Sequence, residues 1–101
     1  MDQRPVSQLR GRGRVTQQGD ELCHVIVDLT EFVRVDASPR RPEFHGFLEL
    51  AGGVPLDVGL PDLLLDLPDG RRVAIEITSL TRNERREVYG VRGRLTPVVD
   101  P

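Results

Sequence analysis

The sequence predicts an all-β protein, folded as a small six-stranded antiparallel barrel or barrel-like sandwich with at most one short helical turn. Apolar and polar residues alternate with a period of two through residues 23–35. Two further alternating segments flank the turn sequence Pro68-Asp69-Gly70. Such alternation places successive side chains on opposite faces of a strand. With 101 residues, the chain is long enough for one core and one domain.

The first two predicted strands form a hairpin. Residues 9–18 make the first strand, and Gln18-Gly19-Asp20-Glu21 makes the turn. The second strand covers residues 23–35 and bends near its middle. Its apolar face is interrupted only by Glu31 and carries Cys23, Val25, Val27, Leu29, Val33 and Val35.

A loop and a third strand follow. Two prolines within residues 37–42 predict the loop, because proline cannot donate a hydrogen bond to a neighbouring strand. Alternation resumes over residues 44–50, and Gly52-Gly53-Val54-Pro55 ends that strand. Glycines within the strand patterns, such as Gly46, allow the sharp bends or bulges that a small barrel needs.

The second hairpin covers residues 62–80. Proline presets φ at the first corner of its turn, and Gly70 accepts the left-handed conformation that closes it. Residues 81–84 have capping-box spacing, but no apolar helical stripe follows, so a polar loop is expected. Residues 89–95 form the last strand. We therefore expect a flexible segment over residues 1–8, a barrel over 9–96 and a tail over 97–101.

Composition narrows the classes of function. The net charge of −2 argues against a general polyanion-binding protein. Cys23 is the only cysteine, which excludes an internal disulfide and favours a reducing, cytoplasmic setting. No signal peptide or membrane-spanning run is evident, so no membrane partner is predicted.

Neither catalysis nor metal binding is predicted. Cys23 and His24 are adjacent in a strand, so their side chains point to opposite faces and cannot form a nucleophile–base pair. His24 and Asp28 lie four residues apart, roughly 13 Å along a strand, which is too far to share a metal ion. His45 and Glu49 have the same spacing. No nucleotide-binding glycine loop is present, and no cofactor is predicted.

All fourteen basic residues are arginines, and three of them alternate with glycine in Arg10-Gly11-Arg12-Gly13-Arg14. In a strand these three side chains share one face, and Arg92 and Arg94 repeat the spacing on the last strand. If the first and last strands pair, the five arginines form one patch that binds phosphate or an acidic partner. The alternative is a solvated face, neutralised by nearby acids.

Apolar residues also occur opposite the main apolar faces of the strands, at Ile26, Phe32, Phe47, Leu64 and Leu80. The leading interpretation is a non-enzymatic module that binds a protein, or itself, through this face or through an exposed strand edge. Alternatively, bulges turn some of these side chains into the core. Nucleotide or nucleic acid is a weaker choice of partner, because only four aromatic side chains are available for stacking.

Two short motifs give a further alternative. Arg10 and Arg14 fit Arg-x-x-x-Arg, and Asp36-Ala-Ser38-Pro-Arg-Arg41 follows them. This arrangement resembles the PilZ family of bacterial cyclic di-GMP receptors, which are small barrels with Arg-x-x-x-Arg and then Asp/Asn-x-Ser-x-x-Gly. Arg41 stands where the family has glycine. The resemblance implies that Arg10 and Arg14 grip phosphate or guanine, and that Asp36 and Ser38 contact the ligand.

Overall fold

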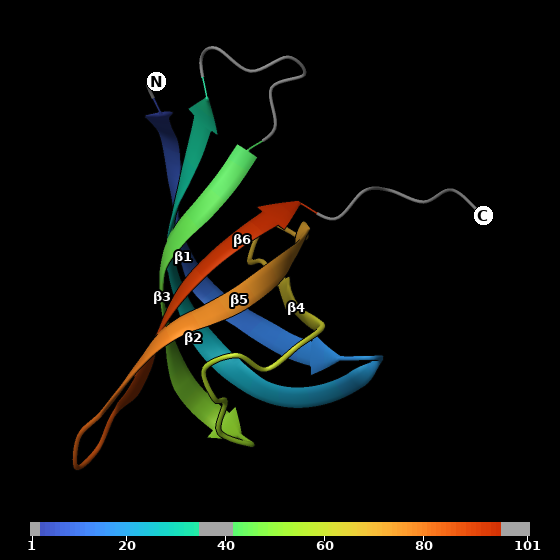
Figure 1. Cartoon of the computed structure of the whole chain (residues 1–101), viewed down its shortest axis with the longest axis vertical. Helices are drawn as coiled ribbons and strands as arrows, with labels where there is room; N and C mark the ends of the chain where they lie inside the picture. Colours follow the sequence, from blue (N-terminus) through green and yellow to red (C-terminus); the bar gives the residue numbers. More distant parts are fainter. Residues whose placement is uncertain (1–2, 35–41, 96–101) are drawn as a thin grey trace.

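The structure, a computed structural model, describes residues 3–34 and 42–95, which form six strands and no helix (Figure 1). The strands are β1 (Gln3–Gln17), β2 (Asp20–Arg34), β3 (Pro42–Gly53), β4 (Leu63–Asp66), β5 (Arg72–Arg82) and β6 (Glu87–Leu95). All neighbouring strands run antiparallel, and the order β1-β2-β3-β6-β5-β4 closes back onto β1. The all-β, six-stranded prediction is confirmed.

Both predicted hairpins are present. Gln18 and Gly19 have φ values of 50° and 88° in the β1–β2 turn, and Gly70 has a φ of 92° in the β4–β5 turn. Strand β1 begins at Gln3, well before the expected start at residue 9. Residues 3–8 of β1 pair with the far end of β2, so much of the segment expected to be flexible is strand. The predicted loop over residues 37–42 and the tail from residue 97 lie outside the described residues, except Pro42.

The first and last strands do not pair, so the condition for a patch of five arginines is not met. Strand β6 lies between β3 and β5, and β1 closes the ring by pairing with β4 over four residues. The tight β5–β6 turn explains this order, because it forces β6 to lie beside β5. In that turn the side-chain oxygen of Asn83 accepts hydrogen bonds from the N–H groups of Arg85 and Arg86. The capping-box sequence therefore forms a turn and no helix.

The core fills the inside of the ring, as the alternation of the strands predicts. Two members come from connections: Leu56, between β3 and β4, and Leu67, between β4 and β5, are both buried. Cys23 is also buried, and His24 next to it points to solvent, as expected. Burial raises the pKa of Cys23 to about 11, so its thiol stays neutral. The buried apolar residues are Val15, Cys23, Val25, Val27, Leu29, Phe44, Leu48, Leu56, Leu63, Leu65, Leu67, Val73, Ile75, Ile77, Tyr89 and Val91.

Glu31, the acid that interrupts the apolar face of β2, forms a partly buried ion pair. Arg71, beside the β4–β5 turn, donates to the Glu31 carboxylate at 2.9 Å, and Ser7 of β1 donates to the same oxygen at 3.1 Å. The Arg71 guanidinium also lies 5.3 Å from the centre of the Phe44 ring. This ion pair links β1, β2 and the β4–β5 turn.

A second polar contact ties the β3–β4 connection to the core. The Tyr89 hydroxyl accepts a hydrogen bond from the N–H of Leu56 at 2.9 Å and donates one to the Glu87 carboxylate. Burial, followed by the hydrogen bond to Glu87, raises the pKa of Tyr89 to about 12. The hydroxyl is therefore neutral at physiological pH.

Tyr89 is the only tyrosine and the chain has no tryptophan, so an absorbance titration reports this one residue. We expect Tyr89 to titrate at about pH 12 in the folded protein and at about pH 10 in the denatured chain. Because the folded pKa is raised, its stabilising effect is complete below the unfolded pKa and is lost as pH rises through the folded pKa. Circular dichroism at each pH identifies the folded range. A folded-state midpoint equal to that of the denatured chain would contradict the buried position of Tyr89.

Candidate binding surface

The three arginines of β1 point outward, as predicted, but two of them are paired. The Arg10 side chain lies 3.4 Å from the carboxylate of Asp28, the residue opposite it on β2. Arg14 lies 3.0 Å from Asp66 of β4 and 3.6 Å from Glu21 of β2. Among the described residues, no side chain forms an ion pair or hydrogen bond with Arg12. The positive charges of this arginine stripe, Arg10, Arg12 and Arg14, are therefore neutralised except at Arg12.

The predicted patch of five arginines does not form. Arg92 and Arg94 lie on β6, which is separated from β1 by β2 and β3 on one side and by β5 and β4 on the other. Arg92 pairs with Glu76 of β5 at 2.9 Å, and Arg94 lies 3.6 Å from Glu43 of β3. The alternative prediction, a face neutralised by nearby acids, describes these two residues.

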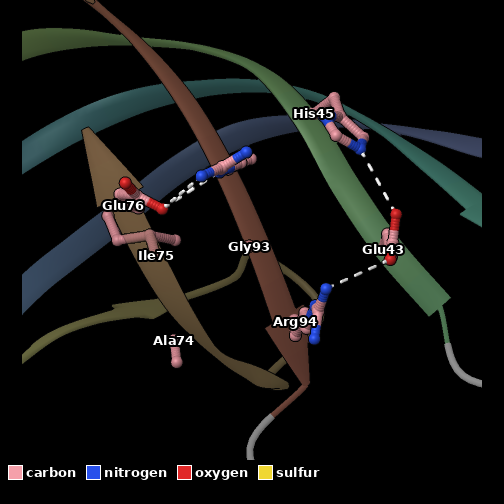
Figure 2. Close-up of a pocket in the computed structure, with 8 residues that line it drawn as sticks. Glu43, His45, Ala74, Ile75, Glu76, Gly93 and Arg94 are labelled. Carbon is pink, nitrogen blue, oxygen red and sulfur yellow. Dashed lines mark hydrogen bonds and ion pairs between the residues drawn. The ribbon is translucent and has the colours of Figure 1, made fainter. Parts of the chain in front are cut away.

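A hollow of about 390 Å³ lies over β3, β6 and β5, next to these ion pairs (Figure 2). His45 Nε2 faces it with no hydrogen-bond partner among the described residues, 3.6 Å from the Glu43 carboxylate. An anion entering here would have to displace Glu43 and Glu76 from their arginines, so this geometry disfavours phosphate. The hollow is lined by Glu43, His45, Ala74, Ile75, Glu76, Arg92, Gly93 and Arg94.

An apolar patch lies on the outer face of β2, β3 and β6. Ile26 is 40% exposed and Phe47 is 57% exposed, although both belong to regular strands. The register sets Ile26 opposite Glu49 and Phe47 opposite Asp28, which makes Ile26 and Phe47 diagonal neighbours on one face. Both predicted residues therefore belong to one outer surface.

Val88 of β6 extends this patch and was not predicted. It lies opposite Glu49 on the side away from Ile26, and it is half-buried. The alternation that turns Tyr89 and Val91 inward turns Val88 outward, so the sequence contained the signal. Glu49 separates Val88 from Ile26 and is held by two hydrogen bonds from Arg86. We call Ile26, Phe47 and Val88 the outer apolar patch.

The other three predicted partner-binding residues lie apart from this patch. Phe32 is partly buried and meets the His45 ring edge-to-face, with centroids 5.5 Å apart. Leu64 lies on β4, which neighbours β1 and β5. Leu80 packs against the core, because a bulge between Ile77 and Ser79 of β5 returns it to the inner side. The outward placement of Leu80 was therefore wrong.

The predicted strand edge also exists, on β1. Within the described residues, β1 pairs with β4 only over residues 14–17, so residues 3–13 have a partner on the β2 side alone (Figure 1). Pro5, which has no N–H, and a register shift between Pro5 and Ser7 interrupt this edge. Proline and bulges at an edge disfavour the addition of another strand. The outer apolar patch is the better candidate.

Neither a metal site, nor a membrane-spanning helix, nor a match to a known protein adds to this surface within the described residues. The part of the chain that the structure describes contains no cluster of three or more His, Cys, Asp or Glu side chains able to hold a metal ion. It also contains no helix that could cross a membrane. No family model, curated protein or solved structure matches the chain. Of the PilZ-like motifs, Arg10 and Arg14 lie within β1, and Asp36 and Ser38 lie outside the described residues.

Proposed function

We propose that this protein is a non-enzymatic binding module that docks another protein onto the outer apolar patch. The exposure of Phe47 carries the proposal. A phenylalanine in the middle of a regular strand, with more than half of its surface in water, gains about 1–2 kcal/mol when a partner buries the exposed part. Aromatic side chains at the centre of such patches are typical binding hot spots.

The surroundings of the patch support a reversible interface. Asp28, beside Phe47, accepts hydrogen bonds from Gln8 and Arg10. Glu49, between Ile26 and Val88, accepts from Arg86, so paired polar and charged side chains surround Phe47. An apolar centre with a polar rim is typical of proteins that also exist free in solution. The bordering pairs keep the free protein hydrated, and the apolar centre drives association.

Replacing Phe47 with alanine should weaken association at least about tenfold, because hot-spot truncations cost about 2 kcal/mol or more. The free energy of unfolding should change by about 1 kcal/mol or less, since the side chain is exposed. Ile26→Asp should also weaken association. Affinity capture from the source cells, followed by binding measurements with the purified partner, and sedimentation for self-association provide the readouts.

Val58→Ala is the matched control, because Val58 is 55% exposed in the β3–β4 connection and lies outside the patch. It should leave association unchanged. Unfolding caused by Phe47→Ala would assign this residue to the core and end the proposal. Equal binding by the wild-type protein and the Phe47→Ala variant would have the same consequence.

A further inference from the structure

A second feature of the same face is a hollow at the edge of the outer apolar patch. It measures about 360 Å³ and is lined by Arg12, His24, Val25, Ile26, Ala51 and Gly52. The register shift between His24 and Val25 creates it, because Ala51 and Gly52 bring little or no side chain to this position. Arg12 lies opposite Ile26 in the pairing of β1 with β2. The hollow thus joins an arginine to the apolar patch.

Arg12 leaves this face with an unbalanced positive charge. Its neighbours Arg10 and Arg14 are paired with carboxylates, and no described side chain pairs with Arg12. The planar guanidinium of an exposed arginine binds a carboxylate or a phosphate through two parallel hydrogen bonds. His24 lines the same hollow, and the acid beside it, Glu21, lies 3.5 Å from His24 Nε2 and 3.6 Å from Arg14. No carboxylate among the described residues is therefore left for Arg12 there.

We propose that the partner is an acidic peptide segment of another protein. It brings a carboxylate to Arg12 in this hollow and an adjacent apolar side chain to Ile26 and Phe47. This inference rests on the proposed function and specifies the chemistry of the partner. Because Arg12 and Ile26 are cross-strand neighbours, an acidic and an apolar residue close together in the segment reach both.

Charge favours such a partner over a second copy of this chain. In a face-to-face dimer, the described carboxylates nearest the patch are those of Asp28 and Glu49, which are already bound by Arg10 and Arg86. The second copy would also bring its own Arg12. A nucleic acid would need several unpaired cations along its phosphates. Of the arginines described on this face, Arg12 alone has no carboxylate partner.

A displayed library of random peptides tests the proposal. Panning against the wild-type protein should enrich peptides in which Asp or Glu lies beside a large apolar residue. Arg12→Gln should remove the preference for acidic peptides. It should also lower the affinity for a synthesised copy of an enriched peptide at least about tenfold, which is the loss expected for one charge-assisted pair. High salt should weaken binding to the wild-type protein more than binding to this variant.

Arg85→Gln is the matched control, because it removes one positive charge at the β5–β6 turn, where no described side chain pairs with Arg85. It should leave peptide binding unchanged. Enriched peptides that depend on Phe47 but show no acidic preference would overturn this inference and leave the proposed function intact. Dimerisation of the wild-type protein with no peptide enriched would also overturn this inference. Peptide binding that Phe47→Ala leaves unchanged would overturn it too, and would in addition refute the outer apolar patch as the docking site.

Discussion

Replacing Gly46 with alanine is expected to destabilise the protein by about 3 kcal/mol or more. Gly46 lies in β3 between Leu29 of β2 and Val91 of β6, with a φ of 156°. A Cβ atom there would lie 2.2 Å from the backbone oxygen of Asp28 and 3.0 Å from the Cα atom of Leu29. Backbone atoms cannot rotate away as a side chain can, so β2 and β3 would have to separate. Overpacking and backbone strain each cost about 1–3 kcal/mol.

Thermal unfolding followed by circular dichroism measures this effect. A loss of about 3 kcal/mol should lower the melting temperature by at least about 12 °C in a domain of this size. Gly52→Ala is the matched control in the same strand, because a Cβ atom at Gly52 meets nothing within 4 Å. It should be neutral, or stabilising by about 0.4–1 kcal/mol. Similar melting temperatures for the two variants would show that β2 and β3 do not approach closely at Gly46.

The strands were predictable from the sequence because the alternation of apolar and polar residues within each strand indicates which side chains are buried. Alternation identified the inward side chains of β2 and of the β4–β5 hairpin, and Gly19 and Gly70 marked turns that require positive φ. The order of the strands around the ring was not predictable in this way. Whether β1 meets β4 or β6 depends on contacts between distant segments, and both arrangements bury the same faces.

The candidate site was predictable only in part, for the same reason. Alternation placed Ile26 and Phe47 outward, and β2–β3 pairing then made them neighbours. Leu80 was misplaced because nothing in the local pattern reveals the bulge at Thr78. The three arginines of β1 were correctly predicted to face outward, and of the two alternatives for their charges, neutralisation by nearby acids describes Arg10 and Arg14. Pairing of Arg10 with Asp28 and of Arg14 with Asp66 follows from strand register, which leaves Arg12 as the unpaired member.

Replacing Leu56 with alanine should cost about 2–5 kcal/mol, although this residue lies in a connection between strands. The Leu56 side chain is fully buried in the core, and its N–H donates to the Tyr89 hydroxyl. Alanine would leave a cavity where the β3–β4 connection covers the barrel. The melting temperature should fall by at least about 8 °C. Val54→Ala, at a position 57% exposed in the segment between β3 and β4, is the matched control and should have little effect.

Tyr89 offers a second readout of the same variant. If alanine at position 56 lets the connection leave the barrel, water reaches the Tyr89 hydroxyl and its pKa falls from about 12 toward the free value of about 10. A large loss of stability with an unchanged Tyr89 titration would mean that the backbone hydrogen bond from Leu56 holds the connection in place without its side chain. Equal stability of Leu56→Ala and Val54→Ala would instead contradict the burial of Leu56. The combined result distinguishes a connection held by its apolar side chain from one held by its backbone.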